Sequence, residues 1–195
     1  FVGGPFTLFT YAVEGSHKGS LVQVKQNLEL FPKFCEILVP LLIQNIQLQF
    51  DGGAETVMLF DTAAGELSPQ LYQNLVLPQI EKIAAKFPQR LGYYAKGTVP
   101  RHHQHSFFAS GILAGLGVDH RWDIRDAFPL AKGFVQGNFD QALLTIEPKD
   151  FLKHLEAFAA PLRKMSAADW GVPVPSPTTV AAGPCSRGSL STAVR

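Results

Sequence analysis

The stretch Phe1-Val2-Gly3-Gly4-Pro5-Phe6-Thr7-Leu8-Phe9-Thr10-Tyr11-Ala12-Val13-Glu14-Gly15 decides the fold, because it ends a strand and carries the chain over that end. Gly3 and Gly4 can adopt backbone angles closed to other residues, and Pro5 fixes the next turn. Ligands of α/β proteins bind in the crevice at the carboxyl ends of strands, so Tyr11 would bring a phenol, both donor and acceptor, to that crevice. The alternative is a buried loop with a core tyrosine, and this run alone favours it.

Beyond this run, short apolar segments bounded by turn residues alternate with helical patterns, and no hairpin signal interrupts them. This alternation predicts an α/β protein with a parallel sheet. The predicted strands are 1–2, 56–60, 91–95, a short segment around 118, and 133–136. The predicted helices are 21–30 with Ser20 as cap, a largely apolar helix over 32–50 that needs cover on most sides, 68–86, 107–116, 127–132 and 148–165.

Composition excludes several classes of protein. The 195 residues are 46% apolar and 17% charged, which is typical of a globular domain. The net charge of +1 gives no general attraction to nucleic acid or to anionic lipid. No signal peptide or membrane span is visible. Cys35 and Cys185 make neither a disulfide framework nor a metal-ligand spacing, and Cys35 reads as a small buried hydrophobe, so we expect a reducing, cytoplasmic location.

Four segments resemble the uroporphyrinogen decarboxylase family, in the family's order and with plausible spacings. The opening run is similar to Gly-x-Pro-Trp/Phe-Thr-Leu followed by Thr-Tyr-x-Val-Glu-Gly. The other three are Phe60-Asp61-Thr62-Ala63-Ala64-Gly65, Leu116-Gly117-Val118-Asp119 and Val135-Gln136-Gly137-Asn138-Phe139-Asp140. Each segment is weak alone, but together they are specific. The resemblance runs from Phe1 to about Lys164.

The resemblance implies a (β/α)₈ TIM barrel, of which the five predicted strands are only a part. On the family's pattern they are the end of the third strand and strands four to seven. We therefore expect an incomplete barrel domain over 1–165, within a chain that is a fragment or lacks its front. The Pro/Ser/Gly-rich tail over 166–195 is expected to be disordered, because alternate prolines exclude a helix or a central strand.

The same resemblance implies an activity. Members of the family convert uroporphyrinogen III to coproporphyrinogen III in haem biosynthesis, releasing four acetate carboxylates as CO₂ without a cofactor. It also implies a homodimer, and it assigns Tyr11 and Thr62 to substrate binding. The family's acid and aspartate lie upstream of residue 1, so no catalytic residue is assigned, and we expect the fragment alone to be inactive.

Other residues near strand ends are weaker candidates for the active face, namely Gly3, Gly4, Phe6, Asp61 and Asp119. For the carboxyl groups among them, the alternative is that a short polar side chain satisfies loose backbone groups at a strand end. We expect Asn138 and Asp140 to be mainly structural.

The sequence departs from the family's motifs in two places. Leu-Asp-Trp becomes Val118-Asp119-His120-Arg121-Trp122, and Gln141 replaces the proline of the last motif.

A metal site is not expected. His102, His103 and His105 have no acidic or cysteine partner nearby and are predicted to lie in a solvated loop. The related cobalamin-linked methyltransferases, an alternative, bind zinc through His-x-Cys after the fifth barrel strand, where this chain reads Tyr93-Tyr94-Ala95-Lys96-Gly97. A non-catalytic truncated barrel is the second alternative.

Overall fold

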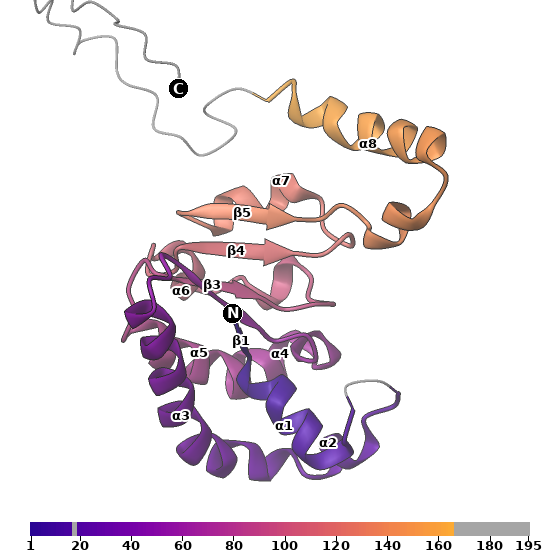
Figure 1. The fold of residues 1–195 in the computed structure, drawn as a ribbon. Coiled ribbons are helices and arrows are strands. Elements are labelled where there is room, and N and C mark those ends of the chain that lie inside the picture. The colour runs from indigo at the N-terminus through magenta and orange to yellow at the C-terminus, as the bar shows by residue number, and fades with distance from the viewer. Residues whose placement is uncertain (17–18, 166–195) are drawn as a thin grey trace, which may run out of the picture.

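A single parallel sheet organises the chain (Figure 1). The computed structural model describes residues 1–16 and 19–165. The predicted fold class is confirmed, because five parallel strands pair in the order in which they occur along the chain, as in part of a TIM barrel. The strands are β1 (Val2–Gly3), β2 (Val57–Phe60), β3 (Leu91–Tyr94), β4 (Gly115–Val118) and β5 (Phe134–Gly137).

Helices and short turns connect the strands. The longer helices are α1 (Pro5–Glu14), α3 (Phe31–Asp51), α5 (Leu77–Ala84) and α8 (Pro148–Leu162), with shorter ones at α2 (Val22–Gln26), α4 (Pro69–Leu71), α6 (Ser106–Ala109) and α7 (Ile124–Ala127). A π-helical turn, η3 (Tyr72–Val76), joins α4 to α5, so one nearly continuous helical segment fills the range predicted from Ser68. Among the described residues, no helix is long and apolar enough to cross a membrane.

The two faces of the sheet have different surroundings. Val57, Leu59 and Leu91 are fully buried beneath the helices and belong to the core. The alternate residues point to the opposite, concave face, where the rings of Phe60 and Tyr94 lie 5.6 Å apart. This alternation follows from the two-residue repeat of a strand, and it gives the sheet a helix-covered side and an open side.

Glycines shape the concave face. A side chain on Gly115 would overlap the ring of Phe134, and one on Gly117 would press on the ring of Tyr94. The bare backbone of β4 therefore leaves room for large side chains from both neighbouring strands. Phe134 nevertheless remains 39% exposed, because within the described residues nothing covers this side of the sheet more fully.

Helix α3 is covered on one side only, although its apolar sequence predicted cover on most sides. Cys35, as expected a buried residue, lies on the inner side, and burial raises the pKa of its thiol to about 12. On the outer side Ile37 is 71% exposed, Leu41 56% and Leu48 69%. These three side chains form an apolar stripe that the described residues leave in contact with solvent.

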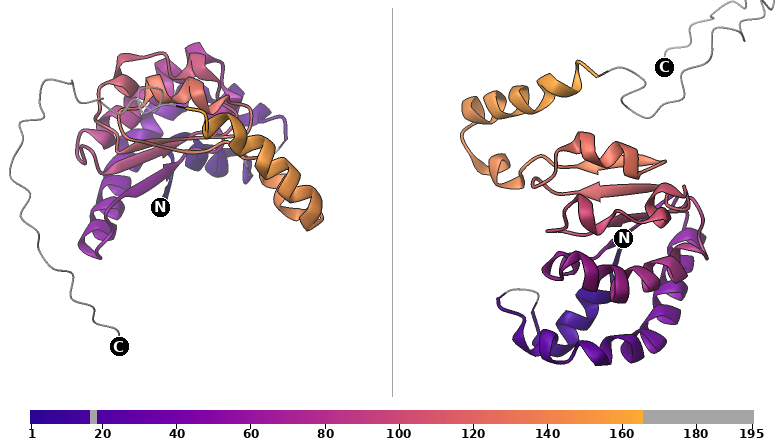
Figure 2. Two further views of the ribbon diagram at one scale, coloured as in Figure 1. Left: turned by 90° about the horizontal axis from the view of Figure 1, so that it is seen from above. Right: turned by 180° about the vertical axis from the view of Figure 1, so that it is seen from behind.

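Helix α8 confirms the predicted helix over 148–165, but none of its residues is buried. Figures 1 and 2 show it standing away from the sheet. Phe139, which follows β5, contacts α8: its ring centroid lies 5.9 Å from that of Phe151 and 5.3 Å from that of Phe158.

The predicted helix over 107–116 is wrong. Only α6 is helical, because Gly111 adopts a positive φ of 82° that ends it, and the last residues of the range pair with β3 as strand β4. An apolar run of this length fits either a buried helix or a buried strand, so periodicity could not separate them.

Two other boundaries differ from the predictions. The range 21–30 divides into α2 and a 3₁₀ turn, and its cap is Leu21 rather than Ser20, with the Glu14 carboxylate accepting from the N–H of Gln23 at 2.7 Å. The range 127–132 contains the end of α7, whose cap is Asp123, and a 3₁₀ turn over Phe128–Leu130. The predicted disordered tail over 166–195 lies outside the described residues.

Candidate active site

The site is built where β1 and β2 end side by side. The N–H of Gly4 donates to the carbonyl of Phe60 at 2.7 Å, which extends the ladder by one bond, and Pro5 then begins α1. A side chain on Gly4 would overlap Asp61. Glycine at this position therefore allows the start of α1 to lie directly against the residue that follows β2.

Asp61 is fully buried and fastens α1 to this edge. Its carboxylate accepts from the N–H of Thr7 at 2.7 Å, from the Thr7 hydroxyl at 2.8 Å and from the N–H of Phe6 at 3.4 Å. Burial raises the pKa of Asp61 to about 6, and the three hydrogen bonds oppose that rise. The side chain satisfies the free N–H groups at the start of a helix, as the strand-end alternative describes.

The loop after β2 wraps around the same helix. The hydroxyl of Thr7 accepts from the N–H of Ala63 at 3.0 Å while it donates to Asp61, so Thr62 is held between two anchored neighbours. Thr62 is partly exposed. Its hydroxyl is therefore carried at the carboxyl edge of the sheet on a loop with little freedom.

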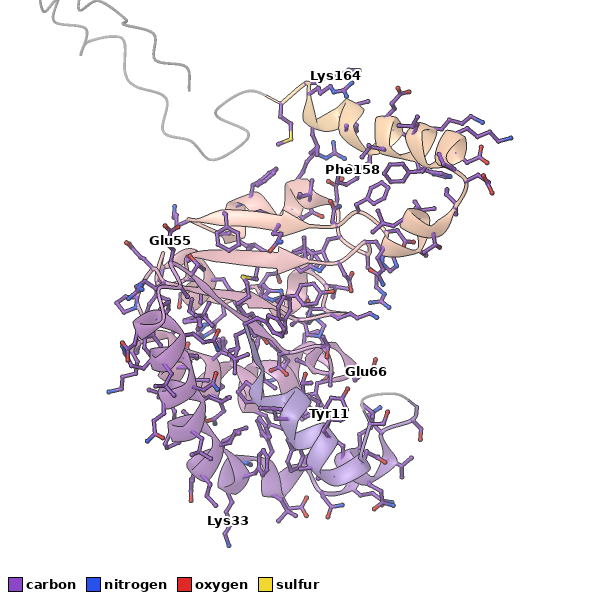
Figure 3. All side chains as sticks on the ribbon, viewed as in Figure 1. Tyr11, Lys33, Glu55, Glu66, Phe158 and Lys164 are labelled. Atoms are coloured by element: carbon purple, nitrogen blue, oxygen red, sulfur yellow. The ribbon has the colours of Figure 1, made fainter. Side chains whose placement is uncertain are left out.

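Tyr11 lies one turn beyond Thr7 on α1, and residues four apart share a helix face. It is 44% exposed, so it is not the core tyrosine of the alternative interpretation (Figure 3). Tyr11 therefore lies on a helix that Thr7 ties to the loop carrying Thr62.

The other candidates from the opening run have packing roles. Phe6 is 1% exposed, and its ring lies 5.5 Å from that of Phe31, so it joins α1 to α3 inside the core. Gly3 pairs with Phe60 within the sheet. Neither presents a polar group to the edge.

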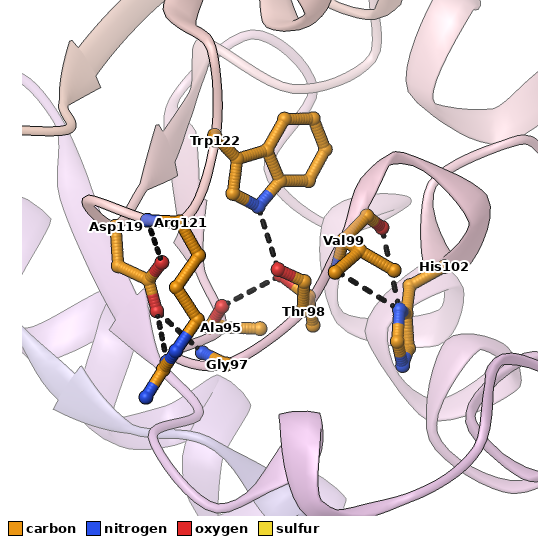
Figure 4. Close-up of polar contacts among 8 residues, drawn as sticks. All are labelled: Ala95, Gly97, Thr98, Val99, His102, Asp119, Arg121 and Trp122. Atoms are coloured by element: carbon orange, nitrogen blue, oxygen red, sulfur yellow. Dashed lines mark hydrogen bonds and ion pairs between the residues drawn. The ribbon is translucent and has the colours of Figure 1, made fainter.

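Asp119, the last of these candidates, joins the loops that follow β3 and β4 (Figure 4). Its side chain is 2% exposed. One carboxylate oxygen accepts from the N–H of Gly97 at 2.6 Å and from Nη1 of Arg121 at 2.7 Å, and the other accepts from the N–H of Arg121 at 2.9 Å. The carboxylate therefore holds a cation at the edge.

Further contacts tie the neighbouring loops together. A side chain on Gly65, after β2, would overlap the carbonyl of Lys96, after β3. The indole N–H of Trp122 donates to the carbonyl of Thr98 at 2.7 Å, and the amide of Asn138 donates to the carbonyl of Trp122 at 2.8 Å. The loops after β2, β3, β4 and β5 thus form one connected rim, in which Asn138 has the structural position expected of it.

A cavity of about 200 Å³ opens on the concave face beside this rim. Phe60 and Tyr94 form part of its wall, and Asp119, Gln136 and Asn138 contribute its polar groups. A larger hollow of about 830 Å³ lies between α8 and the segment that contains Arg125 and Pro129. We assign the smaller cavity to the site, because it lies at the carboxyl ends of the strands.

The histidine segment is not the solvated loop that the sequence predicted. His102 is 4% exposed, and its Nε2 lies 3.0 Å from the carbonyl oxygen of Leu67. His103 is fully buried among aromatic rings, and burial lowers its pKa to about 3. Of these three histidines, only His105 is exposed. The rings around His103 belong to Phe108, Trp122, Tyr72 and Tyr93.

Sequence reasoning missed Arg121 as a functional candidate. It lies two residues after Asp119, where a side chain can fold back on the carboxylate, and it falls in a segment that departs from the family motif. That spacing and that departure were the available signals.

Comparison with known proteins identifies the family. The model of the family described as "Uroporphyrinogen decarboxylase (URO-D)" matches residues 1–166. The chain belongs to this family. The family resemblance predicted from four short segments is confirmed.

Three relatives named uroporphyrinogen decarboxylase show the extent of the likeness. The protein of Idiomarina loihiensis is 33% identical over 158 residues, 76% of this chain and 44% of that protein. That of Chlamydia muridarum is 28% identical over 186 residues, 85% and 52% respectively. That of Nocardia farcinica is 30% identical over 174 residues, 82% and 47%. The chain therefore spans about half the length of the curated relatives it matches.

Within this family's architecture, the described residues hold no group of three or more His, Cys, Asp or Glu side chains that could bind a metal ion. The end of β3, where the methyltransferase alternative requires zinc ligands, carries Tyr94 and the partly buried Lys96.

Proposed function

We propose that the protein decarboxylates uroporphyrinogen III to coproporphyrinogen III, releasing four acetate carboxylates as CO₂ without a cofactor. The family match over 1–166 is the observation that carries this proposal. The geometry of the rim supports it, because the Thr62 hydroxyl and the Arg121 cation occur at the carboxyl edge of the sheet and Tyr11 is exposed on the helix that begins there. A substrate rich in carboxylates needs such hydrogen-bond donors and positive charge.

The chemistry assigns a role to each hydroxyl. A proton first adds to a pyrrole, and the C–C bond to the departing carboxylate then breaks. Its electron pair moves into the protonated ring as CO₂ leaves, and a later proton completes the methyl group. We propose that Tyr11 and Thr62 bind the substrate during these steps, each donating one hydrogen bond. Groups held in place before the reaction stabilise charge better than mobile ones, and the anchored loop and helix provide such support.

Two further expectations belong to the same proposal. We propose that the protein acts in the cytoplasm, which suits its two cysteines. We also propose that it works as a homodimer, and the exposed apolar stripe of Ile37, Leu41 and Leu48 offers one surface for self-association.

The test uses a protein termed here the completed barrel. Residues 1–165 of this chain replace the matching region of the Idiomarina loihiensis relative, whose own flanking segments supply the rest. The completed barrel is expected to form coproporphyrinogen III from uroporphyrinogen III under anaerobic conditions, with no added metal or cofactor. Products are separated by chromatography after oxidation to porphyrins.

Two outcomes would contradict the proposal. A folded completed barrel that forms no product would favour a non-catalytic barrel. Turnover that requires stoichiometric zinc and a methyl acceptor would favour the methyltransferase alternative. The isolated chain is the comparison, and we expect it to be inactive because its concave face is open to solvent, as the exposure of Phe134 shows.

A further inference from the structure

Arg121 is held at the rim with most of its hydrogen-bonding capacity unused. Within the described part of the chain, its guanidinium donates one hydrogen bond, from Nη1 to Asp119. A guanidinium carries five N–H donors in a planar fork that fits a carboxylate. The side chain is 48% exposed, so its free edge reaches solvent while its other edge is fixed.

Asp119 has structural partners apart from this cation. It accepts from the N–H groups of Gly97 and Arg121, so two backbone donors already hold the carboxylate in place. The loop geometry therefore does not require a guanidinium. What the ion pair does is to fix the direction of a charged side chain, which lowers the entropy lost when that side chain binds a ligand.

Glycines open the space around the guanidinium. The Cβ of a side chain on Gly97 would lie 3.4 Å from Nη1 of Arg121 and 3.6 Å from the Cα of Gly65. The loops after β2, β3 and β4 therefore meet here. The loops after β2 and β3 contribute only backbone atoms of Gly65 and Gly97 next to the guanidinium. The Gly65 loop begins with Asp61 and Thr62, so Arg121 lies on the rim that also carries Thr62.

A second aspartate–arginine pair in the same segment provides a contrast. Asp123 accepts from the N–H of Arg125 at 3.0 Å, the same local arrangement. Arg125, however, turns both Nε and Nη2 onto that carboxylate. Both arginines border a hollow of about 360 Å³ beside α8, and neither lines the concave cavity, so the contrast between them lies in how each guanidinium is paired. Arg125 is internally paired, whereas Arg121 keeps a free edge.

We propose that Arg121 is a substrate-binding residue that takes a carboxylate of the substrate and so favours polycarboxylate ligands. The inference rests on the proposed function, because it specifies the cation of that same site. Nε and Nη2 donate to the two oxygens of the ligand carboxylate, while Nη1 stays on Asp119.

The test measures ligand binding and not turnover. The full 195-residue chain is titrated with uroporphyrin III, the stable oxidised octacarboxylate, and binding is followed by the porphyrin's fluorescence. Arg121→Gln removes the charge, Arg121→Lys keeps it, and Arg125→Gln is the matched control. Losing one charge-assisted hydrogen-bonded contact on a partly exposed side chain is expected to weaken binding about tenfold in Arg121→Gln.

The controls are expected to lose little. Arg125→Gln should stay within about threefold of the wild-type dissociation constant, because it leaves Arg121 in place. Arg121→Lys should lose less than Arg121→Gln, because it keeps the charge although an ammonium cannot make the bidentate contact. Circular dichroism checks that every variant keeps the wild-type fold, and Arg121→Lys still tests the role of charge if Arg121→Gln unfolds.

Three results would overturn the inference: no binding by the wild-type chain, equal affinity of Arg121→Gln and wild type, or an equal loss in Arg121→Lys and Arg121→Gln. An inactive completed barrel together with Arg121-dependent binding would remove the proposed reaction and leave the binding site standing.

Discussion

Replacing Asp61 with asparagine should remove a pH dependence from the stability of the protein. Asp61 is fully buried, and its pKa rises from 3.8 to about 6 because burial disfavours the charged carboxylate. A raised pKa in the folded state means that the proton binds more tightly when the chain is folded. This contribution to stability is fully present below pH 3.8 and is lost as the pH rises through about 6.

The magnitude follows from the shift. A pKa change of about 2 units corresponds to a difference of about 3 kcal/mol in the free energy of unfolding between a pH well below 3.8 and a pH well above 6. His103 acts in the opposite direction over part of the same range, because its pKa is lowered to about 3. The quantity to measure is therefore the difference between wild type and Asp61→Asn at each pH, in which the contribution of His103 cancels. Cys35, Tyr72 and Tyr93 lie near the same carboxyl group, but burial raises the pKa of each, so they stay neutral over this range in both proteins.

The assay is urea unfolding of the completed barrel and of its Asp61→Asn variant between pH 4 and pH 8, followed by circular dichroism. Wild type should lose about 3 kcal/mol relative to the variant as the pH rises across this range. Asp140→Asn, which removes a partly exposed carboxylate that caps a short turn, is the control for the loss of a carboxylate elsewhere. A flat difference between wild type and Asp61→Asn would refute the assignment of Asp61 as a buried group that changes charge near pH 6.

Three other predictions concern the protonation of His103, the close approach at Gly4 and the exposed surface of α3. His103→Phe should abolish a loss of stability that wild type shows as the pH falls from 6.5 toward about 3, because the buried imidazole must leave its aromatic surroundings to become charged; thermal melting at pH 4 and pH 8 measures it. Gly4→Ala should destabilise the fold by about 1–3 kcal/mol, because the added methyl group would overlap Asp61. Gly53→Ala, at an open position of positive φ, is the comparison for backbone strain without overlap. Equal urea midpoints for Gly4→Ala and wild type would contradict the close approach. The isolated chain should self-associate through exposed apolar surface, and Ile37→Lys with Leu41→Lys should reduce the apparent mass in sedimentation; a monodisperse wild-type monomer with a cooperative melt would count against this expectation.

Sequence patterns sufficed where local chemistry decides the structure. The break at Gly3-Gly4-Pro5 and the apolar runs of the strands predicted the parallel sheet, because strand ends and turns depend on neighbouring residues. The same logic placed Ser68 at a helix start, where its hydroxyl accepts from the N–H of Leu71.

Patterns failed where the environment of a residue comes from distant parts of the chain. His103 lies in a polar sequence, yet rings from three other segments surround it, and no local signal shows this burial. The pattern predicts the strand around 118 but wrongly extends the preceding helix over Gly115 and Leu116, because the glycines of β4 are explained only by Phe134 and Tyr94 across the sheet. Arg121 was passed over because its free edge depends on how one guanidinium meets Asp119.

The most direct test of the central claim is the rate of coproporphyrinogen III formation by the completed barrel and by its Tyr11→Phe and Thr62→Val variants. Each variant should be slower by about 10-fold to 1000-fold with an unchanged melting temperature, because one hydrogen bond to the reacting substrate is lost. Thr10→Val is the matched control on α1, since the Thr10 hydroxyl is buried and donates to the carbonyl of Phe6, and it should keep the wild-type rate. Wild-type rates in Tyr11→Phe and Thr62→Val would show that these two residues do not bind the substrate at this edge.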